Sequence, residues 1–279
     1  MARKKKTQRK SNSTAPALLV IAPIVVLICA YWIKQNPIKA ECRVSSRIEH
    51  IDYAECPAPG YRDDEVVLYR NGYTVSYNRQ WGLPNWVAYE LIPAELDGDT
   101  ERKNRFITDP DLTGRRAKSN DYTHSGYDRG HMAPAADMKW SDTAMKESFY
   151  MSNICPQVPG LNRGRWKELE DAVRNWCVQD SALLIVCGPI VTEKHTKIGA
   201  NRIAVPDRFF KAIVAPYLSE PRGIAFIFEN RETSPSLPAL AVSIDSLEQV
   251  ICADLFHLLP DSIENIIERQ INLEAWNLE

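Results

Sequence analysis

The sequence is poor in the residues and spacings that build zinc sites. It has only five histidines in 279 residues, and its seven cysteines include no Cys-x-x-Cys pair. A structural zinc centre is therefore not expected. Cys177 and Cys187 lie in apolar patterns and are predicted to be buried thiols. Cys42 and Cys56 are the candidate disulfide pair if their segment lies outside the cytoplasm, with free thiols as the equal alternative.

Acidic residues are absent from residues 1–40, which carry eight of the 34 lysines and arginines. The remainder has 26 basic against 36 acidic residues, a formal charge near −10. A protein that held a polyanion by its overall charge would be basic, so any contact with nucleic acid must come from a local cluster of cations. Internal repeats are also missing, although 44% hydrophobic residues are ample for a globular core.

The N-terminal segment combines a basic start with an uncharged run of 19 residues, 15–33. At about 1.5 Å per residue this run can just cross a hydrocarbon core as a helix, with its basic end in the cytoplasm. A cleaved signal peptide with secretion, or a basic nucleic-acid-binding tail, are the alternatives. We predict a cytoplasmic tail over 1–14, a transmembrane anchor over 15–33, a stalk over 34–63, and a globular domain over 64–279 on the non-cytoplasmic side, in the periplasm or an equivalent compartment.

The hydrophobic pattern of the remainder predicts strands on both sides of two central helices. Asn71-Gly72 indicates a tight two-residue hairpin turn with positive φ, and residues 97–127 read as a long loop of the kind that often carries function. Because βαβ alternation is not regular, we predict an α+β fold with a mostly antiparallel central sheet. The expected strands are 66–69, 73–77, 86–91, 182–186, 203–205, 209–215 and 223–228, and the expected helices are 143–149, 162–177, 245–253 and 262–269.

One histidine stands in a setting suited to chemistry. His131 follows Asp128-Arg129-Gly130, a polar approach loosened by glycine. An imidazole titrates near neutrality and can take a proton from water, as a general base must. A single histidine more often caps or packs, and we interpret His50, His195 and His257 in that way.

Asn162 and Glu170 are candidates for holding a hard cation. Asn162 opens the expected helix over 162–177, where an asparagine ordinarily serves as a cap. Its side-chain oxygen also suits Mg²⁺, which keeps most of its waters and needs few protein ligands. Glu170 lies within roughly 80° of Asn162 around an ideal helix and is placed to hold the ion's water shell. The alternative for Glu170 is an exposed helical charge.

Arginines and lysines near these residues supply the local cluster that the acidic bulk requires. A guanidinium group matches phosphate oxygens through two parallel hydrogen bonds. Runs of charge are more often solvated faces, and that alternative stays open outside the motif region. The cluster consists of Arg102, Lys103, Arg105 and Arg129, with Arg163, Arg165 and Lys167 at the start of the helix.

Three ordered motifs resemble the DNA/RNA non-specific endonuclease family of the ββα-metal superfamily, which includes endonuclease G-like nucleases. The motifs are Asp128-Arg129-Gly130-His131-Met132-Ala133-Pro134, Phe149-Tyr150-Met151-Ser152-Asn153-Ile154-Cys155-Pro156-Gln157, and Leu161-Asn162 to Trp166 with Leu169-Glu170. The likeness extends over about residues 64–261 and leaves out the N-terminal segment. It implies a ββα-metal motif and hydrolysis of phosphodiester bonds in DNA and RNA.

The resemblance also implies roles for single residues. His131 would be the general base, and Asn162 the only direct protein ligand of Mg²⁺, with Mn²⁺ as the alternative ion. Glu170 would bind the water of that ion.

Three further residues receive supporting roles from the resemblance. Asn153 would support the site, Arg129 would contact the phosphate, and a second arginine would be Arg102, with Arg105 as the alternative. DNA, RNA and a membrane are the expected partners, and the oligomeric state is left open. A phosphodiesterase acting on small nucleotides, or an inactive membrane-tethered binding domain, are the competing hypotheses.

Overall fold

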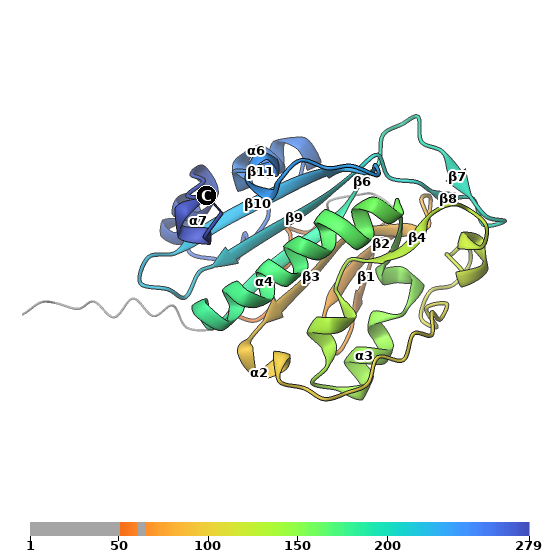
Figure 1. Ribbon diagram of the computed structural model, residues 1–279, viewed down its shortest axis with the longest axis horizontal. Coiled ribbons are helices and arrows are strands. Elements are labelled where there is room, and N and C mark those ends of the chain that lie inside the picture. Colours follow the sequence, from red (N-terminus) through yellow and green to blue (C-terminus); the bar gives the residue numbers. More distant parts are fainter. Residues whose placement is uncertain (1–50, 61–64, 279) are drawn as a thin grey trace, which may run out of the picture. The chain divides into compact units, whose positions relative to one another are not determined.

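The computed structural model describes residues 51–60 and 65–278. Its framework is a seven-stranded sheet in the order β1-β2-β3-β6-β9-β10-β11, in which every neighbouring pair is antiparallel (Figure 1). The predicted mostly antiparallel sheet is therefore confirmed. Its strands are β1 (Glu65–Tyr69), β2 (Thr74–Asn78), β3 (Leu83–Leu91), β6 (Leu183–Ile190), β9 (Arg208–Ala215), β10 (Arg222–Glu229) and β11 (Ala241–Val242).

The first two strands form the predicted hairpin, but its turn differs from the prediction. Tyr69 pairs with Thr74, and the Arg70 N–H donates to the Tyr73 carbonyl at 2.8 Å. The expected positive φ within Asn71-Gly72 is wrong, because both residues have negative φ. Four residues separate the last paired positions, and a loop of that length does not need left-handed backbone.

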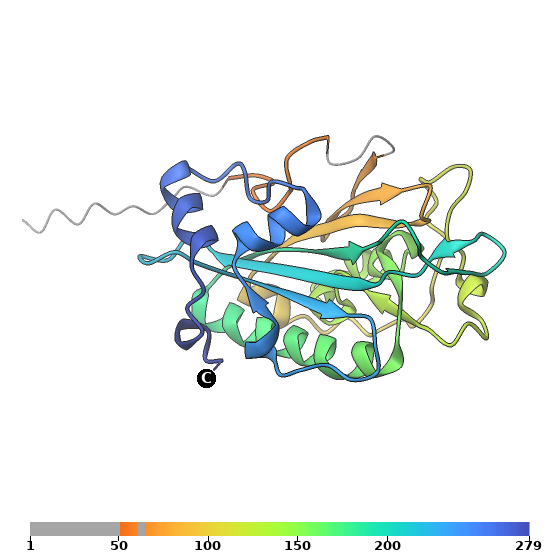
Figure 2. The same ribbon diagram turned by 90° about the horizontal axis from the view of Figure 1, so that it is seen from above.

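Helices cover both faces of the sheet. Figures 1 and 2 show α4 (Trp166–Asp180) along one face, and α6 (Ile244–Ile251) and α7 (Asp261–Arg269) along the other. Side chains of a strand alternate between faces, so in β9 Phe209 packs in the core cluster of α4 while Phe210 packs in that of α6 and α7. The face of α4 predicted to be core is buried, from Trp166 to Cys177.

A separate two-stranded ribbon precedes α4. Strand β4 (Asp128–His131) pairs antiparallel with β5 (Ile154–Gln157), and His131 stands opposite Ile154. Ribbon and helix together make a β-β-α unit, as the resemblance implied. A turn of π-helical type, Leu161–Arg165, connects them and contains non-helical backbone at Gly164. The helix expected from residue 162 therefore begins later, at Trp166.

Several short elements were not anticipated, because a few residues are too short a stretch to show a hydrophobic period. They include η1, which lies inside the expected loop of residues 97–127. The expected helix at 143–149 is α3 (Asp142–Ser148), and the expected strand at 203–205 is β8 (Ile203–Ala204). The unanticipated elements are β7 (Lys197–Ile198), which pairs with β8, α2 (Pro93–Leu96), α5 (Leu237–Leu240), η1 (Ser119–Tyr122), η2 (Ala135–Met138), η3 (Met151–Asn153) and η5 (Glu274–Trp276).

The predicted tail and anchor, residues 1–33, lie outside the described residues, as does most of the stalk. Among the residues that the structure describes, no helix combines the length and the apolar character needed to cross a membrane. Cys42 also lies outside them, so its pairing with Cys56 stays a prediction.

Candidate active site

A pocket of about 270 Å³ lies where the end of β4 meets η2 and the first half of α4. Of the six residues given individual roles from the sequence, all but Asn153 line it, together with Arg163, Lys167 and Arg174. A larger pocket of about 590 Å³ lies at the β9–β10 turn but contains only one acid and one base. We therefore take the smaller pocket as the candidate site, because of the ionisable and amide side chains that line it. Its ionisable and amide side chains are His131, Asn162, Glu170, Arg102, Arg129, Arg163, Lys167 and Arg174.

His131 is held as a neutral base at the end of β4. Its side chain is only 8% exposed, and its ring meets the rings of Phe149 and Phe106 at centroid distances of 4.9 and 5.5 Å. Burial, assisted by the charge of Arg102, lowers the pKa of His131 to about 3. Nε2 has no hydrogen-bond partner among the described residues. The imidazole is therefore neutral near pH 7, and its buried Nε2 is not engaged by another described group.

Asn153 fixes the chain that follows His131. It is fully buried, and its Nδ2 donates to the carbonyls of Ala133 and Ser148, both at 2.9 Å. Its Oδ1 accepts from the Ala133 N–H at 2.9 Å. Asn153 does not line the pocket, so its expected support of the site would act through backbone position.

Asn162 lies in the turn before α4 rather than at its cap. Its Nδ2 donates to Oδ2 of Asp128 at 2.9 Å, and Arg163 donates two hydrogen bonds of 2.7 Å to the same carboxylate. These bonds, Arg163 first, lower the pKa of Asp128. Because an ionised carboxylate only accepts, the Asn162 amide must present its NH₂ group to Asp128. Its carbonyl oxygen is then left for the pocket, and the alternative of a helix cap is wrong.

Glu170 and the adjoining Arg174 form the far side of the pocket. Burial raises the pKa of Glu170 to about 7, although the charges of Lys211 and Arg174 oppose the shift. Arg174 Nη1 donates to the buried carboxylate of Asp137 at 2.9 Å. No role was predicted for Arg174 or Lys211 from the sequence. The sequence pattern could have identified both residues. Arg174 lies four residues after Glu170 on the same helix face, and Lys211 is a charged residue within an apolar strand.

The two expected arginines border the pocket, Arg129 from strand β4 and Arg102 from the loop that follows α2. Arg129 Nη2 donates to the Ser119 carbonyl at 2.7 Å, and its guanidinium lies 5.4 Å from the centroid of the Phe106 ring. Arg102 lies 5.4 Å from the centroid of the Phe149 ring. Arg105, the alternative to Arg102, is exposed and does not line the pocket. The cations thus gather at one mouth, as binding of a phosphate requires.

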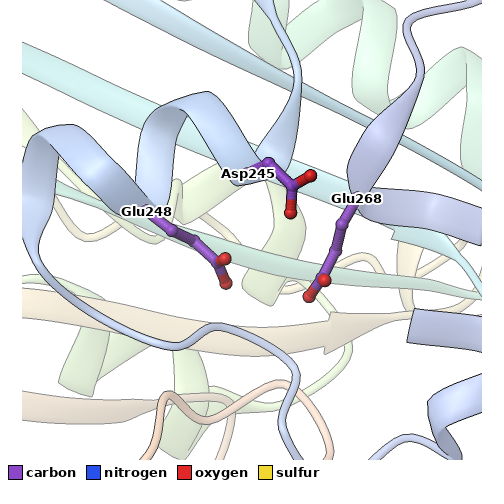
Figure 3. A group of neighbouring side chains, drawn as sticks. All are labelled: Asp245, Glu248 and Glu268. Atoms are coloured by element: carbon purple, nitrogen blue, oxygen red, sulfur yellow. The ribbon is translucent and has the colours of Figure 1, made fainter. Parts of the chain in front are cut away.

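Three carboxylates also approach one another on the opposite face of the sheet. Asp245 and Glu248 of α6 and Glu268 of α7 have oxygens within 4.8 Å (Figure 3). Burial, followed by the neighbouring acids, raises the pKa of Glu268 to about 8. This acidic cluster shares no residue with the pocket and is not part of the candidate site.

Comparisons with known proteins agree with this geometry. The chain is 35% identical to the mitochondrial nuclease of Saccharomyces cerevisiae over 229 residues, 74% of this chain and 70% of that protein. It is 32% identical to human mitochondrial endonuclease G over 195 residues, 64% of this chain and 66% of that protein. A crystal structure of the EndoG/EndoGI complex, which concerns EndoG inhibition, matches with a TM-score of 0.66 at 29% identity, covering 72% of this chain and 90% of that chain.

The names of the relatives correct the predicted location. The yeast and human relatives are mitochondrial nucleases. The prediction of a single-pass membrane anchor with the catalytic domain in the periplasm or an equivalent compartment is therefore wrong. A basic start followed by an apolar run occurs in several kinds of targeting segment, so such a composition does not identify a compartment by itself.

The resemblance noted in the sequence is confirmed over most of the chain. The family model for DNA/RNA non-specific endonucleases matches residues 54–262. This range contains β4, β5, α4 and every side chain of the pocket. The chain belongs to the DNA/RNA non-specific endonuclease family.

Proposed function

We propose that this protein is a metal-dependent endonuclease that hydrolyses phosphodiester bonds in both DNA and RNA. One observation carries the proposal: His131 and Asn162 line the same pocket, with a free ring nitrogen on one and an oriented carboxamide on the other. A proton acceptor and a hard oxygen ligand beside a cluster of cations are the parts that hydrolysis of a phosphodiester needs.

His131 is the proposed general base. The lowered pKa keeps its imidazole unprotonated at neutral pH, so it can accept a proton from a water molecule. Asn153 holds the backbone after it, and the rings of Phe106 and Phe149 restrict its orientation. The base therefore needs little rearrangement before it acts.

Asn162 is the proposed direct ligand of a divalent cation, with Mg²⁺ first and Mn²⁺ as the alternative. The donor set fits such an ion, because an amide oxygen and the carboxylate of Glu170 border the same pocket. Glu170 would bind water held by the ion. When bound, the ion would supply positive charge that stabilises the departing 3′-oxygen.

The arginines of the pocket are proposed to hold the phosphate in line with the attacking water. Arg129 and Arg102 lie on the same side as His131, and their guanidinium groups are braced against aromatic rings. Because the nucleophile is water, the ribose 2′-hydroxyl is not required. Both DNA and RNA can therefore be substrates.

Cleavage of plasmid DNA and of RNA by the full chain tests the proposal. Activity should require Mg²⁺ and disappear in EDTA, and His131→Ala should lower the rate by about 10²–10⁴-fold while the protein remains folded. Asn162→Ala should raise the Mg²⁺ concentration needed for half-maximal rate. His195→Ala, which lies outside the pocket, is the matched control and should be close to wild type.

Three results would contradict the proposal. Full activity of His131→Ala would remove the general base from the mechanism. Faster cleavage of a dinucleotide diester than of plasmid would indicate a phosphodiesterase for small nucleotides. Binding of DNA without any Mg²⁺-dependent cleavage would indicate an inactive binding domain.

A further inference from the structure

Lys211 is a charged side chain in the centre of the sheet. It lies on β9, between Cys187 of β6 and Phe226 of β10, and is fully buried. Alternation along β9 places it with Phe209 on the face covered by α4. Its Nζ lies 4.8 Å from the centroid of the Trp166 ring and has no hydrogen-bond partner among the described residues.

Such a position has a high energetic cost. Removing an ammonium group from water costs several kcal/mol unless anions face it, and a cation–π contact offsets only about 2 kcal/mol of that. Glu170 lies four residues after Trp166 on α4, one helical turn along from the ring that Lys211 contacts. Glu170 and Asp137 are the two anions that interact electrostatically with Lys211. Asp137 already has other partners, since it accepts from Arg174 at 2.9 Å and from the Tyr89 hydroxyl at 3.1 Å.

The ionised form of Glu170 depends on the positive charge of Lys211 more than that of Asp137 does. Four charged groups act on it: Lys211 from β9, Asp137 from η2, and Arg174 and Asp171 from its own helix. The two aspartates oppose its ionisation. Arg174 favours it, but this guanidinium is hydrogen-bonded to both aspartates. Lys211 is therefore the one of these cations not committed to another carboxylate by a hydrogen bond.

We propose that Lys211 is a positioning residue of the nuclease site, whose buried charge keeps Glu170 as a carboxylate directed at the pocket from beneath helix α4. The inference rests on the proposed function, in which Glu170 must bind the water of a divalent cation. Lys211 touches neither substrate nor ion. It acts through Glu170, across the low-dielectric interior where charges interact over longer distances than in water.

Titration of Glu170 in the metal-free full chain is the direct test. Glutamate carboxyl carbons labelled with ¹³C are followed by NMR, and Glu170→Gln identifies the signal. Lys211→Met keeps the length of the side chain and removes the charge, so the titration midpoint of Glu170 should rise by about one pH unit or more. Lys211→Arg should restore much of the shift. Lys197→Met, an exposed lysine outside the pocket, should leave the midpoint unchanged.

The pH profile of plasmid cleavage gives a second readout. Lys211→Met should lower the rate about fivefold or more near pH 7 and approach wild type in alkaline solution, where Glu170 ionises without help. A purely structural lysine would instead lower the rate by the same factor at every pH. In a Glu170→Gln background, Lys211→Met should cause little further loss, because its target is already gone.

The outcomes separate this inference from the proposed function. An active nuclease whose Glu170 midpoint and pH profile do not change in Lys211→Met overturns the inference alone. A shifted midpoint in a protein without nuclease activity supports the coupling of Lys211 to Glu170 and contradicts the proposed function. If Lys211→Met does not fold, Lys211→Gln is measured in its place, with the same criteria.

Discussion

Burial away from water sets the direction of the pKa shifts of His131 and Glu170 in this pocket. Burial pushes both His131 and Glu170 toward their uncharged forms, lowering the pKa of the first and raising that of the second. The chemical consequences are opposite. Neutral imidazole is the form a base requires, whereas a neutral carboxyl group cannot serve a cation site. Burial therefore keeps His131 in its unprotonated form, while the ionised form of Glu170 depends on neighbouring cations.

Glu170→Gln should stabilise the metal-free protein at pH 8 while lowering its activity. The pKa of Glu170 is raised from 4.5 to about 7 by burial, so the folded protein binds more protons than the unfolded chain between these values. Stability therefore falls as pH rises through that window. At pH 8 the variant should have a free energy of unfolding higher by about 1–3 kcal/mol. Urea denaturation at pH 4.5 and pH 8 measures the difference, which should be small at the lower pH.

Glu168→Gln is the control for this prediction. Glu168 lies on the same helix but is exposed and forms a surface ion pair with Arg165. Its replacement should change stability by less than about 0.5 kcal/mol at either pH. Equal effects of the two substitutions would show that burial of Glu170 is not the cause.

Close packing between β4 and β5 positions His131 at the scale of the elements. A Cβ on Gly130 would lie 2.0 Å from Oε1 and 2.7 Å from Cγ of Gln157, which is fully buried. Only a residue without a side chain allows this ribbon to close. The hydrogen bond from Asn162 to Asp128 joins the start of β4 to the turn before α4.

Gly130→Ala should therefore displace β4 and weaken the site. Overpacking of this kind costs about 1–3 kcal/mol of stability, and a shifted His131 should also lower the rate of plasmid cleavage. Thermal unfolding and the cleavage assay report the two effects. Gly130→Ala combined with Gln157→Ala removes the overlapping atoms and should recover stability relative to Gly130→Ala. Failure of the double variant to recover, with Gln157→Ala alone close to wild type, would exclude the overlap as the cause.

Charge is separated across the whole molecule. The cations of the pocket lie on the α4 face of the sheet, and the acidic cluster of Asp245, Glu248 and Glu268 lies on the other face (Figure 3). A polyanion approaching the protein therefore meets opposite fields on its two sides. This arrangement reconciles a chain of slightly acidic composition with a basic site.

Glu268→Gln should stabilise the protein above neutral pH. Burial and then neighbouring acids raise the pKa of Glu268 from 4.5 to about 8, so stability is lost as pH rises between these values. The neutral side chain removes the repulsion within the cluster. Because the group is partly solvated, we expect a rise in Tm of about 2–4 °C at pH 8.5 and little change at pH 4.5. Scanning calorimetry with Glu193→Gln, an exposed acid, as control checks the prediction.

Local sequence patterns determined much of the fold and the family of this protein. Apolar runs and turn residues predicted the main strands, the spacing of Trp166, Leu169 and Val173 predicted the buried face of α4, and the motifs around His131 and Asn162 identified the family. Periodicity is reliable here because a strand or helix repeats its geometry every few residues, and one face must be buried.

Only the tertiary structure decided which side chains share the pocket and in what state. It placed Asn162 before the helix rather than at its cap, put Arg102 rather than Arg105 at the mouth, and set the buried Lys211 against Trp166 of α4. These outcomes depend on contacts between residues 30 or more positions apart and on how far folding excludes water from each charge. Local residue spacing predicts neither quantity, because the burial of a side chain and the electric field at it depend on the folded core around it.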